Sequence, residues 1–159
     1  MDPTITLPYQ ELVLAATQGA MHTSKACRQG YNNYDHGGQS SRTVSKRLGD
    51  SILGELGELA LSRHLNLSKT SSADFSTGDV ADGMEVRTTE HPNGHLIVYE
   101  TDPDARFFLA TVDFGQQIEV SLPGWIMLED ALRPEYKRNS DPPAYWIPQS
   151  DLHPINPHN

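Results

Sequence analysis

The sequence lacks the features that mark secreted and membrane-spanning proteins. It holds a single cysteine, Cys27, which cannot form a disulfide within the chain. No apolar stretch approaches the roughly 20 residues needed to cross a bilayer. The start MDPTITLPYQ has neither the basic residues nor the apolar run of a signal peptide. We therefore expect a soluble protein of the cytoplasm with no membrane partner.

Basic residues are scarce as well. Lysine and arginine total 12 against 21 aspartates and glutamates, a net charge of -9, which argues against broad, non-specific binding to nucleic acid. The charge is nevertheless uneven, because residues 74–104 hold eight acids and one base, whereas residues 22–47 hold one acid and five bases. The five bases are Lys25, Arg28, Arg42, Lys46 and Arg47. They are compatible with a surface that contacts a polyanion, but a chance basic patch on an acidic protein or a disordered loop explains the same residues.

At 159 residues the chain is expected to form one domain, spanning 1–159, whose core needs no disulfide or metal. We divide it into a helical part (8–65), a sheet core (73–122) and a proline-rich part (123–159). Pro8 suits the start of a helix that continues from Tyr9 to about Cys27. Ser41 or Thr43 can cap a longer helix that runs to about Leu65. The apolar residues of this second helix recur at helical spacing and form one stripe, namely Val44, Leu48, Ile52, Leu56 and Leu59.

After this helix the apolar period changes to two. The segments MEVRTT, HLIVYET, RFFLATVDF and QIEVSL alternate as strands do, with turns at HPNG, DPDA and Gly-Gln between them. A long helix followed by an antiparallel meander predicts an α+β or layered α/β fold. Trp125 and Trp146 are expected to cover a face of the sheet.

The stretch GDVADGMEVRTT, which ends in the first of these strands, places acids and a base around a tight turn. Glu85 and Arg87 lie two residues apart in the strand and share a face, while Met84 and Val86 enter the core. A hairpin at the turn would bring the carboxylate of Asp79 beside Glu85. Adjacent carboxylates repel unless a cation lies between them, and oxygen ligands suit Mg²⁺ or Mn²⁺. A surface hairpin with solvated side chains accounts for the same residues.

The long helix contributes two further acids, Glu55 and Glu58, three residues apart on one side. Glu55 falls inside the apolar stripe and Glu58 lies at its edge. A carboxylate that faces a core costs several kcal/mol unless it is paired, neutralised or bound to metal. At least one of the two therefore needs a partner, which is either a metal ion or a base such as Arg63, unless this side of the helix is exposed.

The order of these acids along the sequence resembles that of the PD-(D/E)xK nuclease superfamily, which carries a Glu on a helix and then Asp and Glu-x-Lys on a strand hairpin. The helix reads Gly54-x-x-x-Glu58-x-x-Leu61-x-x-x-Leu65, similar to the Gly-x-x-x-Glu-x-x-Ala-x-x-x-Leu of several branches. Gly78-Asp79-Val80 and Glu85-Val86-Arg87-Thr88-Thr89 look like the Asp and Glu-Val-Lys-Thr parts. The segments NGHLIVYETDPDARFFLATVD, GWI and YWIPQSDLHP look like uncharacterised bacteriophage proteins with this core. The resemblance covers about residues 41 to 150.

This resemblance implies a restriction-endonuclease-like core, with a long helix packed on a mixed, mostly antiparallel sheet. It implies that Asp79 and Glu85 bind Mg²⁺ or Mn²⁺, and that Glu58 is a further ligand or water-binding carboxylate. Glu55 is held in reserve for the role of Glu58. The backbone carbonyl of Val86 would also face the metal.

Arg87 departs from the family, which most often has Lys at this position. Lysine can share a proton and orient a water molecule, whereas arginine stays protonated and grips phosphate as a rigid fork. Arg87 either stabilises developing negative charge or marks a branch that binds without cutting.

Three further features have simpler explanations. His95 precedes the next strand and could reach the site from that neighbouring segment, although a lone histidine there is more commonly structural. His91 and His95 alone are too few for a zinc site. Asp102 and Asp104 bracket Pro103 in what is most simply a solvated turn.

The residues favour a small, phage-associated, Mg²⁺-dependent nuclease that hydrolyses phosphodiester bonds of DNA, with the basic segment 25–47 facing the DNA. The alternative is a catalytically silent protein of the same fold that binds a host protein or nucleic acid as an anti-defence or regulatory factor. An acidic DNA mimic, a third hypothesis, needs carboxylates spread along one face. Many relatives pair to cut both strands, so a homodimer is compatible with the resemblance, and a phage-encoded protein would act in the host cytoplasm.

Overall fold

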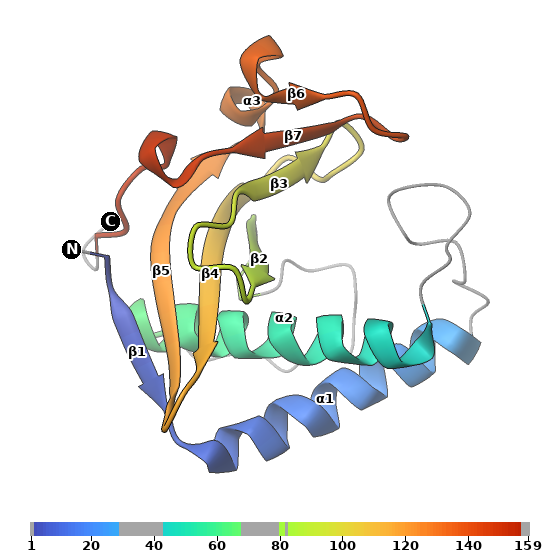
Figure 1. Cartoon of the computed structure of the whole chain (residues 1–159), viewed down its shortest axis with the longest axis vertical. Coiled ribbons are helices and arrows are strands. Elements are labelled where there is room, and N and C mark those ends of the chain that lie inside the picture. The colour runs from blue at the N-terminus through green and yellow to red at the C-terminus, as the bar shows by residue number, and fades with distance from the viewer. Residues whose placement is uncertain (1, 29–42, 68–79, 82, 157–159) are drawn as a thin grey trace.

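The computed structural model describes residues 2–28, 43–67, 80–81 and 83–156. Two long helices follow the short strand β1, and the other strands come after them, so the protein belongs to the predicted α+β class (Figure 1). Short 3-10 turns lie at Pro134–Tyr136 and Gln149–Asp151. The other elements are β1 (Thr4–Leu7), α1 (Tyr9–Arg28), α2 (Val44–His64), β2 (Met84–Thr89), β3 (Leu96–Tyr99), β4 (Arg106–Phe114), β5 (Ile118–Met127), α3 (Leu128–Ala131), β6 (Lys137–Arg138) and β7 (Ala144–Ile147).

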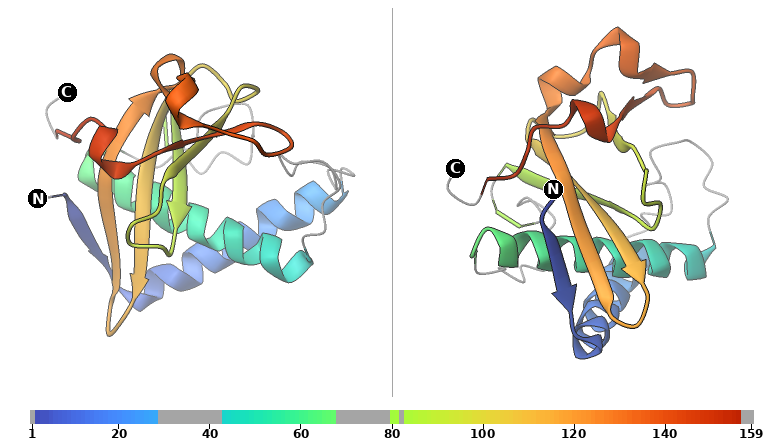
Figure 2. Two further views of the ribbon diagram at one scale, coloured as in Figure 1. Left: turned by 45° about the horizontal axis from the view of Figure 1, so that its top comes forward. Right: turned by 60° about the vertical axis from the view of Figure 1, so that its left-hand side comes forward.

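The described strands form two sheets (Figures 1 and 2). The large sheet has the order β1-β5-β4-β2, in which β5 is antiparallel to both neighbours and β2 is parallel to β4. The small sheet has the order β3-β7-β6 and is antiparallel throughout. The large sheet is therefore mixed and mostly antiparallel, as expected.

The predicted meander is wrong, although all four of its strands exist. A parallel pair such as β2 and β4 needs a crossover of a dozen or more residues, and residues 90–105 provide it. Within this crossover, β3 leaves the large sheet and pairs with β7. The strand β1, at the start of the chain, was not predicted; its four residues pair with β5.

Both predicted helices are confirmed. α1 begins directly after Pro8, and Thr43 caps α2, where its hydroxyl accepts a hydrogen bond from the backbone N–H of Lys46 at 3.3 Å. The apolar stripe is confirmed at the fully buried Leu56 but is wrong at Val44, which is 64% exposed where α2 projects past β2 (Figure 1). None of the helices within the described ranges carries the length of apolar sequence that a bilayer span requires.

Strand β4 lies between two cores because its side chains alternate between its faces. Phe108 and Val112 pack with α2 in the first core, which α1 extends from the other side of α2. Phe107 and Leu109 pack in the second core, against the small sheet and α3. The fold is therefore a stack of helices, large sheet and small sheet.

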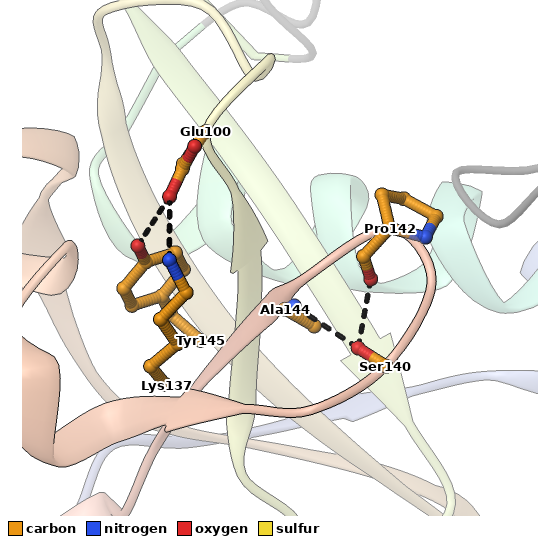
Figure 3. Close-up of polar contacts among 6 residues, drawn as sticks. All are labelled: Glu100, Lys137, Ser140, Pro142, Ala144 and Tyr145. Atoms are coloured by element: carbon orange, nitrogen blue, oxygen red, sulfur yellow. Dashed lines mark hydrogen bonds and ion pairs between the residues drawn. The ribbon is translucent and has the colours of Figure 1, made fainter.

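A polar cluster links strands β6 and β7 to Glu100, the residue that follows β3 (Figure 3). The carboxylate of Glu100 accepts hydrogen bonds from the hydroxyl of Tyr145 at 2.5 Å and from Nζ of Lys137 at 3.2 Å. These two donors, the Tyr145 hydroxyl first, hold the pKa of the Glu100 carboxyl below its usual range. In the adjoining turn, the hydroxyl of Ser140 donates to the carbonyl of Pro142 and accepts from the N–H of Ala144.

Gly57 determines how closely α2 approaches the large sheet. A Cβ atom at this position would collide with Oγ1 of Thr88 and lie only 3.1 Å from Cγ1 of Val86. At Gly54, one turn earlier in the same helix, a Cβ atom would meet no atom within 4 Å. The absence of a side chain at Gly57 therefore permits the contact between α2 and β2.

We predict that Gly57→Ala lowers the free energy of unfolding by about 1–3 kcal/mol, the usual cost of overpacking. Gly54→Ala is the matched control, and it is expected to raise the same quantity by up to about 1 kcal/mol because alanine favours the helix. Urea denaturation of both variants measures the difference. Equal stability of the two variants would contradict the packing role of Gly57.

Candidate active-site cleft

A cleft of about 870 Å³ opens beside β2, the edge strand of the large sheet in the described part of the chain. One wall is formed by α2 together with His22 of α1, and the floor by residues 86–89 of β2. The opposite wall consists of the loop 91–95 and side chains of the small sheet. The cleft therefore lies where the helices, the large sheet and the small sheet meet.

Several of the predicted site residues lie together in this cleft. They are Lys46, Glu55, Glu58, Val86, Arg87 and His95. Glu85 is not among the lining residues; it is half-buried near the start of β2, beside Phe107 of β4. Asp79 and Arg42 lie outside the described residues.

The predicted basic segment is divided between different surfaces. Lys46 lines the cleft, where its Nζ lies 3.6 Å from Oδ1 of Asp50. Lys25 and Arg28 line a separate, apolar groove along α1, and Arg47 is half-buried outside the cleft lining. Of the described basic residues in this segment, Lys46 alone faces the cleft.

The two helix glutamates differ in their surroundings. Glu55 is 3% exposed, and its Oε1 lies 3.3 Å from Nδ1 of His22, which is 37% exposed. The prediction that at least one of the two glutamates has a partner is confirmed at Glu55, which pairs with His22, whereas Arg63 pairs with Glu11. Glu58 is half-buried in the wall of the cleft one turn further along.

The two faces of β2 are used as predicted. Val86 is 6% exposed in the first core, and Met84 packs against the same core. Arg87 therefore lies on the opposite face, and its guanidinium carbon is 5.3 Å from the centre of the Phe107 ring.

The expectation of a solvated turn is wrong for Asp102, whose side chain is 1% exposed. Its Oδ1 accepts a hydrogen bond from Nη2 of Arg87 at 2.9 Å, and its Oδ2 accepts one from the backbone N–H of Tyr99 at 2.9 Å. Asp104, on the other side of Pro103, is exposed as expected. The sequence signal for this pair is that Arg87 is the one base in the acidic stretch 74–104 and enters a half-buried strand.

The loop 91–95 is held in place at the mouth of the cleft. The side chain of Gln149 donates hydrogen bonds to the carbonyls of Pro92 at 2.8 Å and Gly94 at 3.1 Å. Oγ1 of Thr89 accepts the N–H of His91, and a Cβ atom at Gly94 would lie 2.6 Å from Cγ2 of Thr89. These contacts fix the loop against the end of β2.

The described residues by themselves do not assemble a metal site. Within those ranges, no three or more histidine, cysteine, aspartate or glutamate side chains are grouped to hold a metal ion. The predicted set of Glu58, Asp79 and Glu85 includes Asp79, which is not described, so this set stays a prediction. Oγ1 of Thr88 is buried without a hydrogen-bond partner in the described part, and Thr88 lines the cleft.

We predict that Asp102→Asn lowers the free energy of unfolding by about 1.5–3 kcal/mol, because it removes a charged hydrogen-bond partner from Arg87. Asp104→Asn removes the same charge two residues away on the surface and is expected to change stability by less than about 0.5 kcal/mol. Urea denaturation of both variants provides the measurement. Equal losses in the two variants would show that the Arg87–Asp102 pair does not stabilise the fold.

Comparison of the chain with models of protein families, with curated proteins and with solved structures gave no match. The resemblance to PD-(D/E)xK nucleases therefore stays an expectation based on the motifs. What the structure adds is the common location of Glu58, Val86 and Arg87 in one cleft.

Proposed function

We propose that this protein is a Mg²⁺- or Mn²⁺-dependent nuclease of the PD-(D/E)xK type that hydrolyses phosphodiester bonds of DNA. The observation that supports the proposal is the meeting of the helix motif and the strand motif: Glu58 of α2 lines the same cleft as Val86 and Arg87 of β2. The packing of α2 against β2 and β4 is compatible with the restriction-endonuclease-like core that the motifs imply.

The donor set suits the proposed metal. Glu58, Asp79 and Glu85, with the backbone carbonyl of Val86, would hold the ion, and all are hard oxygen donors of the kind that Mg²⁺ prefers. Among the helix acids, Glu58 suits this role better than Glu55, which is almost fully buried against His22. When bound, the ion supplies positive charge that offsets the phosphate and favours the loss of a proton from water.

Arg87 would orient the phosphate. Its Nη2 is engaged by Asp102 and its guanidinium lies over Phe107, so the side chain is held in one direction while 31% of it remains exposed. The N–H groups that Asp102 does not use can donate to phosphate oxygens. Because Asp102 balances its charge, Arg87 would contribute direction more than net attraction.

We predict that Glu58→Gln and Glu85→Gln each weaken Mn²⁺ binding by at least about 10-fold and reduce DNA cleavage in parallel, because each removes a carboxylate from the metal set. Isothermal titration with Mn²⁺ and cleavage of plasmid and single-stranded DNA measure the two effects. Glu119→Gln is the matched control, since Glu119 is an exposed glutamate on β5 outside the cleft. Wild-type affinity for Mn²⁺ in Glu85→Gln would defeat the assignment.

A second function is favoured by one observation, the pairing of Arg87 with Asp102. An arginine cannot serve as the proton-sharing lysine of the family, and this one already has an ionic partner. The same fold would then act as a catalytically silent protein that binds a host protein or nucleic acid.

Arg87→Lys separates the two functions. If the protein is the nuclease, the wild type already cleaves DNA with Mn²⁺, whatever the activity of the lysine variant, because lysine does not reproduce the fork of the arginine. Cleavage by Arg87→Lys together with an inactive wild type would establish the silent protein instead. Plasmid nicking, followed over time at equal protein concentrations, gives the readout.

A further inference from the structure

The wall of the cleft opposite α2 is built from one face of the small sheet. Side chains alternate along β3, so Leu96 and Val98 are fully buried in the second core while Ile97 and Tyr99 line the cleft. Trp146 of β7 is the register partner of Ile97, and directly opposed residues of antiparallel strands share a face. This wall is therefore apolar and aromatic, whereas the α2 wall carries the charged side chains.

Trp146 is unusual on this wall because it is both anchored and exposed. It lies in the central strand of the small sheet, between the buried Tyr145 and Ile147, yet 40% of its surface is open. The ring of His95 lies beside it, with 5.9 Å between ring centres and 47° between planes. The loop that carries His95 is held by the hydrogen bonds of Gln149. A rigid aromatic surface therefore faces the cleft before any ligand binds.

The volume of the cleft and the need for an open face limit which ligands can stack on this aromatic surface. A volume of about 870 Å³ lies within the range of small-ligand pockets, roughly 300–1,000 Å³. In a double helix the faces of the bases are covered by their neighbours, so only an unpaired base offers its face to an aromatic side chain. Base–aromatic stacking tolerates any sequence because every base has such a face.

We propose that Trp146, with His95 beside it, is a stacking site for an unpaired base of single-stranded DNA. This inference rests on the proposed nuclease function, because it assigns the substrate of the same cleft. The base would stack on the aromatic wall while the backbone phosphate lies toward Lys46, Arg87 and the proposed metal site. The protein therefore selects single strands or frayed ends over intact duplex.

The test compares three variants in binding a fluorescently labelled, single-stranded oligodeoxythymidylate, with Ca²⁺ replacing Mg²⁺ to prevent cleavage. Trp146→Ala is expected to weaken binding by about 5- to 100-fold, the range for loss of one base–aromatic stack. Trp146→Phe keeps an aromatic face and is expected to bind within about 3-fold of the wild type. Phe114→Ala is the matched control, because Phe114 is 41% exposed and lies outside the cleft lining.

Intrinsic fluorescence tests contact between the base and Trp146 directly, because a Trp146 that only stabilised the fold would not be quenched by the oligonucleotide. The oligonucleotide is expected to quench tryptophan emission of the wild type, and this quenching should disappear in Trp146→Phe although binding persists. A duplex of the same length should bind more weakly than the single strand and lose less affinity in Trp146→Ala. Thermal melting of each variant establishes that it is folded.

The outcomes separate this inference from the nuclease proposal. If the wild type cleaves DNA but Trp146→Ala binds the single strand like the wild type, or no more weakly than Phe114→Ala, the stacking site is wrong and the nuclease proposal stands. If binding depends on Trp146 but no cleavage occurs with Mn²⁺, the stacking site stands and the protein is the silent kind. A wild type that does not bind the single strand overturns the inference.

Discussion

The contact between α2 and β2 at Gly57 is the constraint on which the cleft depends. Because Gly57 has no side chain, the side chains of Thr88 and Val86 can lie against the helix backbone, in the space that a Cβ atom would need. Glu58 follows immediately in the helix, so this contact determines its distance from the edge of β2. A helix held further away would leave the helix acids and the strand residues in separate places.

Three carboxylates in or beside the cleft have partners on another turn or another element. Glu55 meets His22 of α1, Asp50 meets Lys46 one turn earlier, and Asp102 holds Arg87 of β2. Burial makes an unpaired charge costly, so the partners of Glu55 and Asp102 satisfy two buried carboxylates, whereas Lys46 and Asp50 meet where both side chains are exposed. The net charge of -9 therefore describes the whole chain and not the groups that face a ligand in the cleft.

Periodicity accounts for the elements that were predicted well. Helical spacing located α1 and α2, and alternation located β2 to β5, because both patterns report which side of a local element is buried. The same patterns failed at the meander, since alternation does not encode the partner or the direction of a strand. Val44 fits the stripe of α2 but is exposed, because α2 extends past β2.

For the candidate site, the sequence by itself determined that Glu85 and Arg87 share one face of a strand and that Glu55 lies inside an apolar stripe. Both statements follow from backbone geometry within one element. Only the tertiary structure decided that Asp102 holds Arg87 and that Trp146 stands beside His95, because these residues meet after the crossover has packed β3 against β7. Such neighbours depend on how separate elements pack, and local spacing along the chain carries no record of that packing.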